Sequence, residues 1–568
     1  MADDDEGRKR GQSFLDKQAE KRLLEIQSEG DVNPYRGTDD ANADLLIGLH
    51  GEDILFCPDW DKWLIWDGAH WAIDARLDID RLAADVPKSL RAKASEYTEK
   101  RSKILLKMAT LQNEFPLPDE YGKLQIRQRA LLDRSEWLLK LSSKLELTGK
   151  RSCMLSAARH KVVTVTKDLN RWPFLLNAIN GTIDLKIGEL RPHAREDRLT
   201  HQVCIQFDPA ATCPTWLSFL DSIFNSDADL IQFVQRAIGY SLTGDVREQI
   251  IMICHGCGSN GKSVFLNILK KLLGELALQA APDLLMTDIS RRHPTEQADL
   301  YEKRVVVCQE TGEGRRFNET LVKQLTGGDS VRARRMREDF WTFEPTWKIW
   351  LSTNHKPEIR GTDHAIWRRV RLIPFNVTFH DPGAGVPVKD SKMEEKLTAE
   401  LPGILSWAVC GAISWQADGI PAPQAVMTAT NDYRASQDTV AAWLGECCLV
   451  RRDLEAKSAD LYASYKNWCE QAGERPHSQK KLGMLLDEKG FSREKRREHY
   501  RIGIGILETN IKNERDPCDL SGHFLPISSI NKKFKMSDSL VGGNDKTGNI
   551  GHIGHIDPKK IADDWCPE

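Results

Sequence analysis

The chain has 568 residues and a mass of 64.4 kDa, which is enough for roughly three to five structural units and excludes a single small binding module. Hydrophobic residues make up 40% of the chain and charged residues 29%, so a disordered scaffold is excluded for most of its length. The formal net charge is −3, so any affinity for nucleic acid must come from local basic clusters.

The sequence shows no targeting signal. No stretch approaches the roughly 18–20 uncharged apolar residues that cross a bilayer. The N-terminal MADDDEGRKR lacks the basic-then-apolar order of a signal peptide, and the 13 cysteines are scattered at irregular intervals. We therefore expect a cytoplasmic protein with reduced thiols and no membrane partner.

The first 200 residues predict a mixed α+β region. Residues 1–40 are polar and charged, and we expect them to be disordered or to form a frayed helix. Residues 53–74 alternate aromatic and polar side chains, which predicts a tight hairpin whose tryptophans pack in its core rather than stack on bases. Apolar spacing predicts helices from about 78 to 147, a second hairpin over 180–193 and two helices over 214–238.

Residues 249–274 (QIIMICHGCGSNGKSVFLNILKKLLG) hold the most informative pattern, an apolar run followed by a glycine-rich turn and a helix. The turn satisfies G-x-x-x-x-G-K-[ST], in which backbone N–H groups hold phosphates, Lys262 reaches the β- and γ-phosphates and Ser263 coordinates the metal. Both flanks disfavour the alternative of a chance glycine loop. We therefore predict ATP and Mg²⁺ as cofactors. The predicted ATP-binding residues are Gly256, Gly258, Ser259, Asn260, Gly261, Lys262, Ser263 and Val264.

Two further strands are predicted to carry catalytic groups. Residues 304–310 (RVVVCQE) read as a buried strand with Glu310 just past its carboxyl end, where it serves as general base and, with Ser263, holds Mg²⁺. Residues 348–352 (KIWLS) predict another strand, followed by Asn354, which we expect to orient the lytic water and to sense the γ-phosphate.

A pair of arginines, Arg368 and Arg369, precedes a further apolar strand. A guanidinium offered to a neighbouring subunit's γ-phosphate would stabilise charge during phosphoryl transfer, and hydrolysis would then require an oligomer. Two solvated arginines at the entrance of a strand are the alternative.

Four segments in this order, GCGSNGKS, VVVCQETGEG, TGGDSVRARR and LSTNHKP, resemble the superfamily 3 helicases, specifically the phage and plasmid primase-helicase family related to poxvirus primase-helicases. The likeness covers roughly residues 50–500. It implies a hexameric AAA+ ring that hydrolyses ATP and moves along single-stranded DNA, with 3′ to 5′ as the expected polarity. It also implies that Asn354 is the sensor and that Arg369, or else Arg368, is the trans-acting finger.

The resemblance places a channel hairpin between the acidic strand and the sensor strand, and the residues there suit single-stranded DNA. Arginines can neutralise phosphates and stack on bases, and Phe340 and Trp341 lie beside them. A charged surface hairpin closed by an aromatic core contact is the alternative for the two aromatics. The predicted DNA-binding residues of this hairpin are Arg332, Arg334, Arg335 and Arg337.

The C-terminal part predicts a winged helix, because from Ser478 the order is helix, turn, basic segment and short strands. Residues 475–501 carry nine Lys and Arg against four Asp and Glu, as expected for contact with duplex or fork DNA. A solvated basic helix is the alternative. The predicted phosphate contacts are Lys480, Lys481, Arg496 and Arg497.

These patterns together predict an α/β fold with an AAA+ P-loop NTPase core and a parallel sheet. The core, with a helical collar at its start, is assigned to residues 206–385. An α+β pre-helicase region at 41–205 precedes it, a helical and winged-helix domain at 386–510 follows it, and residues 511–568 are expected to be a flexible tail.

The leading hypothesis is a replicative DNA helicase of a phage or other mobile element, acting as a homohexamer on single-stranded DNA and on fork or origin DNA. We expect no room ahead of these modules for the polymerase-type primase domain that the family often carries, and the sequence shows no zinc-binding primase pattern, so a separate primase or polymerase is the expected partner. One alternative is an origin-binding or defence-associated DNA sensor that uses ATP as a switch. Another is a small-molecule P-loop kinase, which the arginine-rich hairpin and the paired arginines disfavour.

Overall fold

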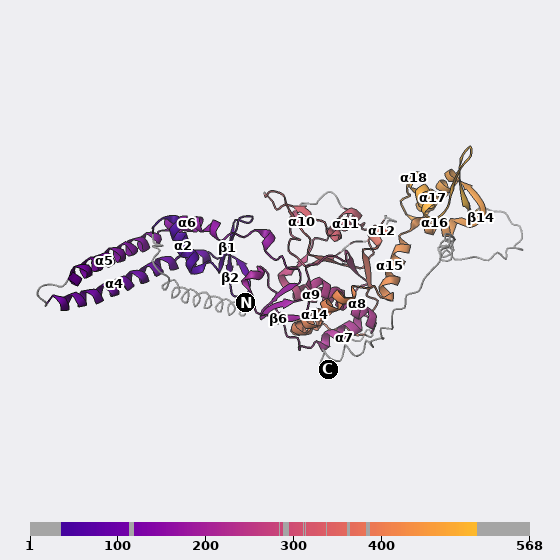
Figure 1. Cartoon of the computed structure of the whole chain (residues 1–568). Coiled ribbons are helices and arrows are strands. Elements are labelled where there is room, and N and C mark those ends of the chain that lie inside the picture. Colours follow the sequence, from indigo (N-terminus) through magenta and orange to yellow (C-terminus); the bar gives the residue numbers. More distant parts are fainter. Residues whose placement is uncertain are drawn as a thin grey trace, which may run out of the picture. The chain divides into compact units, whose positions relative to one another are not determined.

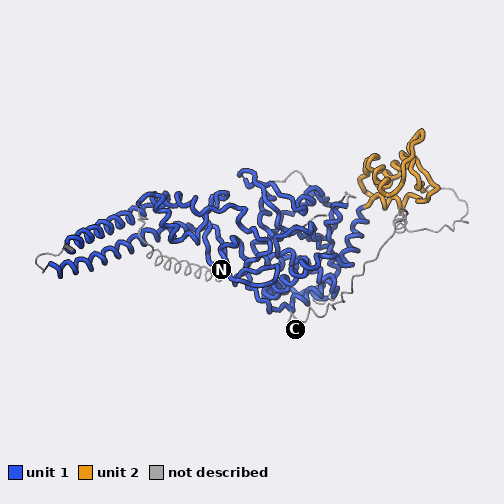
Figure 2. Tube along the Cα trace, in the orientation of Figure 1, with its two compact units in different colours: residues 1–437 blue, residues 438–568 orange. Residues whose placement is uncertain are grey.

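A computed structural model describes residues 36–112, 119–282, 284–287, 295–309, 312, 314–336, 338–359, 364–381 and 387–507. The chain forms two compact units, residues 1–437 and 438–568, which Figure 2 colours blue and orange. The first unit thus includes the helices after residue 386, which the sequence grouped with the C-terminal domain. Residues 1–35 and the predicted tail at 511–568 lie outside the described residues.

The position of helix α14 (Leu401–Asp418) explains this different boundary. It packs on α8 (Ala228–Leu242), and a Cβ added at Gly239 or Gly411 would stand within 2.3 Å of the facing backbone. The two helices therefore approach so closely that glycine is required at the crossing, and α14 belongs to the core of the first unit. Its neighbours are α13 (Met393–Ala399) and α15 (Gln424–Ser436).

The N-terminal region of the first unit combines a small antiparallel sheet with helices. Helix α2 (Asp39–His50) begins at Thr38, whose hydroxyl accepts a hydrogen bond from Ala41 N at 3.2 Å. Trp66 and Trp71 are each 3% exposed in the sheet, which confirms that they serve packing. The other elements are β1 Ile54–Cys57, β2 Lys62–Trp66, β3 Trp71–Ile73, α3 Asp78–Ala83 and α6 Thr148–Ala158.

Helices α4 (Asp85–Leu111) and α5 (Asp119–Leu145) lie side by side as a long hairpin (Figure 1). Shielded residues recur every seven positions, as in a coiled coil. Ser135 Oγ donates to Ala94 O and Ser142 Oγ to Pro87 O, each at 3.0 Å. These bonds fix the antiparallel register of the pair. The shielded positions of α5 are Tyr121, Leu124, Gln128, Leu131, Ser135, Leu138, Ser142 and Leu145.

A second antiparallel sheet, β4-β5-β6, contains the hairpin predicted over residues 180–193. It leads into α7 and α8, and Asp227 caps α8 by accepting a hydrogen bond from Leu230 N at 3.0 Å. The bounds are β4 Leu175–Ala178, β5 Gly181–Asp184, β6 Glu189–Arg191 and α7 Pro214–Ile223. Short 3₁₀ turns are η1 Arg159–Lys161, η2 Thr166–Asp168, η3 Arg195–Asp197 and η4 Gly274–Leu276.

A five-stranded parallel sheet lies at the centre of the first unit, in the order β13-β7-β12-β9-β8. Its three middle strands are buried along most of their length, as their unbroken apolar runs predicted. The strands are β7 Ile251–His255, β8 Ala277–Gln279, β9 Val305–Gln309, β12 Lys348–Thr353 and β13 Val370–Pro374. Between them lie α9 Lys262–Leu273, α10 Thr295–Ala298, α11 Glu319–Gly327, β10 Val331–Ala333, β11 Trp341–Phe343 and α12 His364–Trp367.

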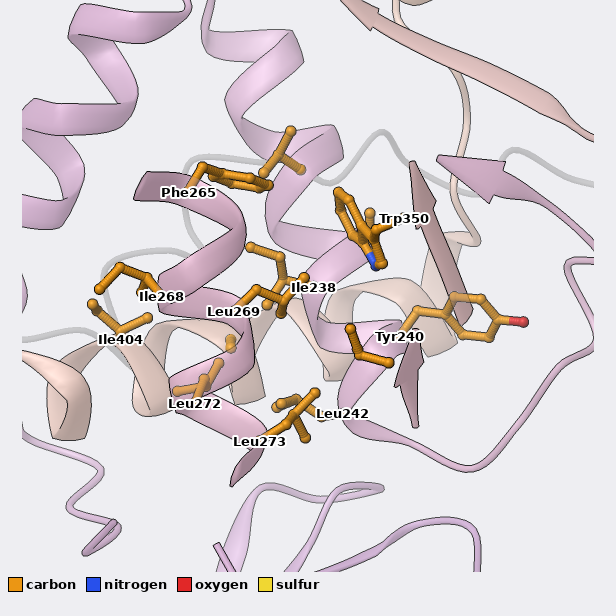
Figure 3. Close-up of a cluster of buried hydrophobic side chains, with 14 of the residues drawn as sticks. Ile238, Tyr240, Leu242, Phe265, Ile268, Leu269, Leu272, Leu273, Trp350 and Ile404 are labelled. Carbon is orange, nitrogen blue, oxygen red and sulfur yellow. The ribbon is translucent and has the colours of Figure 1, made fainter. Parts of the chain in front are cut away.

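Helix α9 is held against the sheet by a large apolar core (Figure 3). Phe265 and Leu269 of α9 pack with Ile238 of α8, Trp350 of β12 and Ile404 of α14, and all five are at most 1% exposed. Burying a large apolar side chain contributes about 1.5–3 kcal/mol. The helix that begins at Lys262 is therefore a fixed element of the core rather than a loosely attached one.

Two buried cations satisfy backbone carbonyls at the amino ends of β9 and β12. Arg304 donates to Leu242 O and to Leu175 O, and burial lowers its pKa to about 10. Lys348 donates to three carbonyl groups, and burial lowers its pKa well below the usual value. Leu242 O, bound by Arg304, and Thr243 O, bound by Lys348, lie at the C-terminal end of α8. Carbonyl groups at the end of a helix have no hydrogen-bond donor within the helix.

An acid–imidazole cluster lies beside Arg304. Glu302 contacts His201 Nε2 at 3.0 Å and accepts a hydrogen bond from Asn170 Nδ2 at 2.7 Å, while Glu275 lies 3.5 Å from His201 Nδ1. Burial alone would lower the pKa of His201, but its hydrogen bonds to the two carboxylates raise it. Burial would likewise raise the pKa of Glu302, but the bond with His201 lowers it.

The second unit has its own core, built from helices packed on a three-stranded antiparallel sheet in the order β14-β16-β15. Arg501 is 3% exposed and donates to Asp487, Phe491 O and Gly483 O, which fixes the strand against helix α18. The elements are α16 Thr439–Cys447, β14 Cys448–Lys457, α17 Ser458–Ala472, α18 Gln479–Glu488, β15 Arg493–Lys495 and β16 His499–Ile506.

Within the described part of the chain, no single helix is long and apolar enough to cross a membrane. Helices α13 and α14 reach that length and hydropathy only together, and they are bent by 74° at their junction.

Candidate functional site

The predicted phosphate loop lies between the end of β7 and the start of α9, at the carboxyl edge of the parallel sheet. A Cβ at Gly256 would stand 2.2 Å from Phe375 O. Gly261 has a φ of +85°, and a Cβ there would stand 2.6 Å from Ile223 Cγ2. Shape and backbone conformation therefore require both glycines, whereas Gly258 is surrounded by open space.

Lys262 places a buried ammonium in this loop. The residue is 5% exposed, and its Nζ donates to Gly256 O at 2.5 Å and to Asn354 Oδ1 at 2.9 Å. Burial lowers the pKa of Lys262. No carboxylate in the described ranges forms an ion pair with Lys262, and both of its hydrogen-bond acceptors are neutral oxygens. A buried cation with this environment favours an anionic ligand.

The segment that follows β13, residues 375–379, holds the loop in place through hydrogen bonds of its own backbone that the sequence did not predict. Phe379 N donates to Ser259 O at 2.7 Å, and Asn260 Nδ2 donates to Phe375 O at 3.2 Å. Asn260 is 3% exposed, so this predicted ATP-binding residue shapes the loop from within. Each of these hydrogen bonds joins residues more than 100 positions apart in the sequence, so no local pattern predicts them.

The remaining loop residues differ in exposure. Ser263 is exposed on the first turn of α9, where its hydroxyl is accessible to a metal ion, and Val264 is partly buried against the core. Ser259 has a φ of +58°, which is unusual for a residue with a side chain. The residues that the structure describes contain no group of three or more His, Cys, Asp or Glu placed to bind a metal.

Strand β12 lies between β7 and β9, and all three end at the same edge of the sheet. Asn354, which follows β12, is therefore positioned between the phosphate loop and the end of the acidic strand, with its amide oxygen on Lys262. Gln309 ends β9 and is exposed. Glu310, the predicted general base, lies outside the described residues.

His255, at the end of β7, is a site residue that the sequence analysis missed. Burial, together with the positive charges of Lys356 and Lys262, lowers the pKa of His255 to about 4. The imidazole is therefore neutral at physiological pH, and the positive charge beside the loop comes from the two lysines. A histidine directly before a glycine-rich loop was the available sequence signal.

The two candidate finger residues have opposite environments. Arg368 is exposed, and its Nη2 donates to Gln249 Oε1 at 2.8 Å. Arg369 is 8% exposed, and its Nη1 donates to Ala365 O at 2.5 Å. Only Arg368 presents its guanidinium at the surface of this chain.

The arginine-rich hairpin is formed by β10 and β11, which pair antiparallel. Arg332, Arg334 and Arg335 are exposed, and the guanidinium groups of Arg332 and Arg334 each lie 4.8 Å from the ring centre of Phe340, which is 46% exposed. Trp341 instead packs on Tyr301 and Phe343, so the core alternative holds for this tryptophan. Arg337 lies outside the described residues.

The predicted phosphate contacts of the second unit are not equivalent. Lys480 and Arg497 are exposed, and Lys481 is partly buried near the start of α18. Arg496 is held by Glu455 at 2.8 and 3.0 Å and by Glu494 at 3.1 Å, and these hydrogen bonds raise its pKa. Because two carboxylates already neutralise it, Arg496 is a poor phosphate contact.

A surface cavity of about 650 Å³ lies elsewhere, against the two small sheets of the N-terminal region. Its arginines are already paired, Arg191 with Asp197 at 2.7 Å and Arg195 with Asp53 at 2.7 Å. The cavity therefore offers little unpaired positive charge, and the loop after β7 remains the candidate functional site.

Comparisons with known proteins match two separate parts of the chain. A family model described as D5 N terminal like matches residues 43–225, and a family of unknown function, DUF5906, matches residues 254–369. A protein of Acanthamoeba polyphaga mimivirus named as a candidate helicase is 26% identical over 324 residues, covering 53% of this chain and 33% of the relative. The chain is thus similar to D5-like proteins over its N-terminal region and to a viral candidate helicase over about half of its length.

Other relatives of this chain come from large DNA viruses as well. A candidate helicase of Invertebrate iridescent virus 6 is 28% identical over 233 residues, covering 39% of this chain and 24% of the relative. A candidate primase of African swine fever virus (strain Badajoz 1971 Vero-adapted) is 23% identical over 352 residues, covering 55% and 34%. The chain spans about one third or less of the length of these relatives.

Among solved structures, the apo C-terminal region of NrS-1 aligns with this chain at a TM-score of 0.38 and 14% identity, covering 53% of this chain and 78% of that one.

Proposed function

We propose that the protein is an ATP-dependent DNA helicase acting in the replication of a phage or other mobile element. The observation that carries the proposal is the Lys262 ammonium, which is buried in a glycine-built loop and held by Gly256 O and Asn354 Oδ1. A cation in the loop and a neutral amide from the adjacent strand suit a triphosphate whose terminal phosphate is cleaved. Similarity to the D5 N terminal like family model and to viral proteins named as candidate helicases supports a role in replication.

The residues present fit ATP and Mg²⁺. Gly256 and Gly261 leave no room for side chains, so backbone N–H groups and the start of α9 can approach phosphate oxygens. Lys262 would hold the β- and γ-phosphates, and Ser263 with Glu310 would hold the metal ion. Bound there, Mg·ATP would supply the phosphate bond whose cleavage drives movement, while Asn354 would orient the attacking water.

We further propose that hydrolysis is completed between subunits of a homohexamer. A finger must reach the γ-phosphate of a neighbouring subunit, so it must be exposed on its own chain. This requirement favours Arg368 and disfavours Arg369, which is buried and bonded to Ala365 O. The order of preference given by the resemblance is therefore reversed in our proposal.

The finer fold assignments are also part of the proposal. The strand order β13-β7-β12-β9-β8, with β12 between β7 and β9, supports an AAA+ core. The order α16, β14, α17, α18, β15, β16 supports a winged helix. The exposed β10–β11 hairpin, with its arginines around Phe340, supports tracking of single-stranded DNA, with 3′ to 5′ as the proposed polarity. Primers would come from a separate primase or polymerase.

The test is ATP hydrolysis by the full chain with and without single-stranded DNA, together with displacement of a labelled strand from a fork. Lys262→Ala is expected to lower hydrolysis at least about 100-fold, because it removes a charge that meets the transferred phosphate. Lys270→Ala is the matched control, since Lys270 lies on the same helix and bonds Gln279. Unchanged turnover in Lys262→Ala would refute the proposal. Negligible hydrolysis combined with ATP-dependent duplex affinity would favour the ATP-switched sensor.

A further inference from the structure

The α4–α5 hairpin has the opposite charge to the chain as a whole. Residues 85–145 contain 13 Lys and Arg against 8 Asp and Glu, a net charge of +5, whereas the whole chain has a net charge of −3. The ATP site and the β10–β11 hairpin are formed by other parts of the sequence. The excess positive charge on this hairpin therefore needs an explanation of its own.

The cations of α4 and α5 differ in how many form ion pairs. Six of the seven cations of α4 form ion pairs with Asp or Glu, and the seventh, Arg101, donates to Gln128 Oε1 at 3.2 Å. On α5, Arg129 pairs with Asp133. The other five cations of α5 are exposed and have no ion pair or hydrogen bond within the described ranges. They are Lys123, Arg127, Arg134, Lys140 and Lys144.

We propose that these five residues, the α5 surface, bind the phosphate backbone of duplex DNA. The proposal rests on the proposed function as a DNA enzyme and adds a contact that the ATP site does not require. In the coiled-coil repeat of α5, all five lie away from the positions that face α4. They are therefore accessible along one side of a helix that packing holds straight.

The length of the α5 surface fits one turn of duplex. Lys123 and Lys144 are 21 residues apart, and a rise of 1.5 Å per residue places them about 32 Å apart along the helix axis. One turn of B-DNA is about 34 Å long. A rod with charges at this spacing can follow the backbone of one duplex turn without reading its sequence.

Single-stranded DNA and an acidic protein fit this surface less well. Single strands are usually held by aromatic side chains that stack on bases. Of the two aromatic side chains on α5, Tyr121 accepts a hydrogen bond from Gln112 Nε2 at 2.6 Å. Trp137 is 40% exposed and lies beside Gly37, where an added Cβ would stand 3.3 Å from its ring, so the surface offers one ring rather than a row of them. Partners rich in Asp and Glu would need matching apolar contacts to bind specifically, and on α5 the most exposed apolar side chain is Ile126.

The test is the affinity of the full chain for a 20-base-pair duplex, measured by fluorescence anisotropy over a range of salt concentrations. Replacing all five cations of the α5 surface by Gln is expected to weaken binding about 10- to 100-fold and to reduce the slope of log K against log salt by about 3–5. The matched control replaces five ion-paired lysines of α4 by Gln and should change both quantities far less. These are Lys88, Lys93, Lys100, Lys103 and Lys107.

Equal losses in the two variants, or no loss in the α5 variant, would overturn the inference. Polyglutamate that competes as well as duplex would overturn it in favour of an acidic protein. ATP hydrolysis stimulated by single-stranded DNA should survive in the α5 variant, so failure of this inference and failure of the proposed function are distinguishable. If the fivefold variant does not fold, the double variant Arg127→Gln, Arg134→Gln is expected to reduce the salt slope by about 2.

Discussion

Gly256→Ala is the sharpest test of the phosphate-loop geometry. The new Cβ would stand 2.2 Å from Phe375 O, and ordinary van der Waals contact begins at 3.4 Å, so the loop or the strand must shift by about 1.2 Å. Phe375 N is itself bonded to His255 O at 2.8 Å, so the segment after β13 cannot move away alone. The displacement must therefore fall largely on the loop.

A misplacement of about 1 Å in a site that positions reacting groups costs about 100-fold in rate, or about 2.7 kcal/mol. We therefore expect Gly256→Ala to lower kcat/KM for ATP by about two orders of magnitude. Gly258→Ala is the control, because its Cβ would meet no atom within 4 Å. Both variants should be compared by steady-state hydrolysis and by binding of a fluorescent ATP analogue, with thermal melting as a check on folding. Equal activity in the two variants would refute the reasoning.

Three further predictions concern other groups. Asn354→Ala should lower kcat for ATP about 10- to 100-fold in the hydrolysis assay while changing analogue binding less than fivefold, because the amide acts on the transferring phosphate. Arg368→Ala should abolish DNA-stimulated hydrolysis without lowering Tm, whereas Arg369→Ala should lower Tm, because it removes a side chain that is 8% exposed together with its hydrogen bond to Ala365 O, a bond worth about 0.5–1.5 kcal/mol. His201→Gln should destabilise the protein more at pH 6 than at pH 8.5 in urea unfolding.

The sign of the pH effect follows from the two shifts. The pKa of His201 is raised, so its contribution is complete below the unfolded value of about 6.5 and is lost as the pH rises through the folded value. The pKa of Glu302 is lowered, so its contribution is lost as the pH falls below about 4.5 and through its folded value. His160→Gln, on an exposed residue, is the control, and equal destabilisation at both pH values would contradict the argument.

For the other two predictions, the contradicting results are equally concrete. An Asn354→Ala variant that loses nucleotide binding and hydrolysis in equal proportion would mean that the amide positions Lys262 instead of acting on the phosphate. An Arg368→Ala variant with normal hydrolysis beside an inactive but normally stable Arg369→Ala variant would restore the original order of the two arginines.

The local parts of the site were predictable from the sequence because they follow from chain chemistry. Gly256, Gly261 and Lys262 are fixed by the loop pattern. The apolar runs of β9 and β12 predict buried strands, and this prediction does not depend on which strands lie beside them in the sheet. Glycine spacing and apolar runs both act over a few residues, so one sequence carries them.

Other features depend on residues that are far apart in the chain. The burial of Arg369 and the pairing of Arg496 with Glu455 are set by tertiary packing, which the adjacent sequence does not encode. The bracing of Asn260 by Phe375 is another example. The boundary near residue 386 was misplaced for the same reason, because α14 joins the first unit through glycine contacts with α8 that periodicity does not reveal.

The buried hydrogen bonds at the amino end of β9 determine which fragments of this protein can fold. Arg304 is held partly by Leu175 O, and Glu302 by Asn170 and His201, so an ATPase fragment cut at the predicted boundary after residue 205 would lose all three partners. Removing one partner of a buried charge costs about 3–5 kcal/mol, a large share of the stability of a single domain. The smallest autonomous ATPase should therefore begin before residue 170 and carry the second small sheet with it.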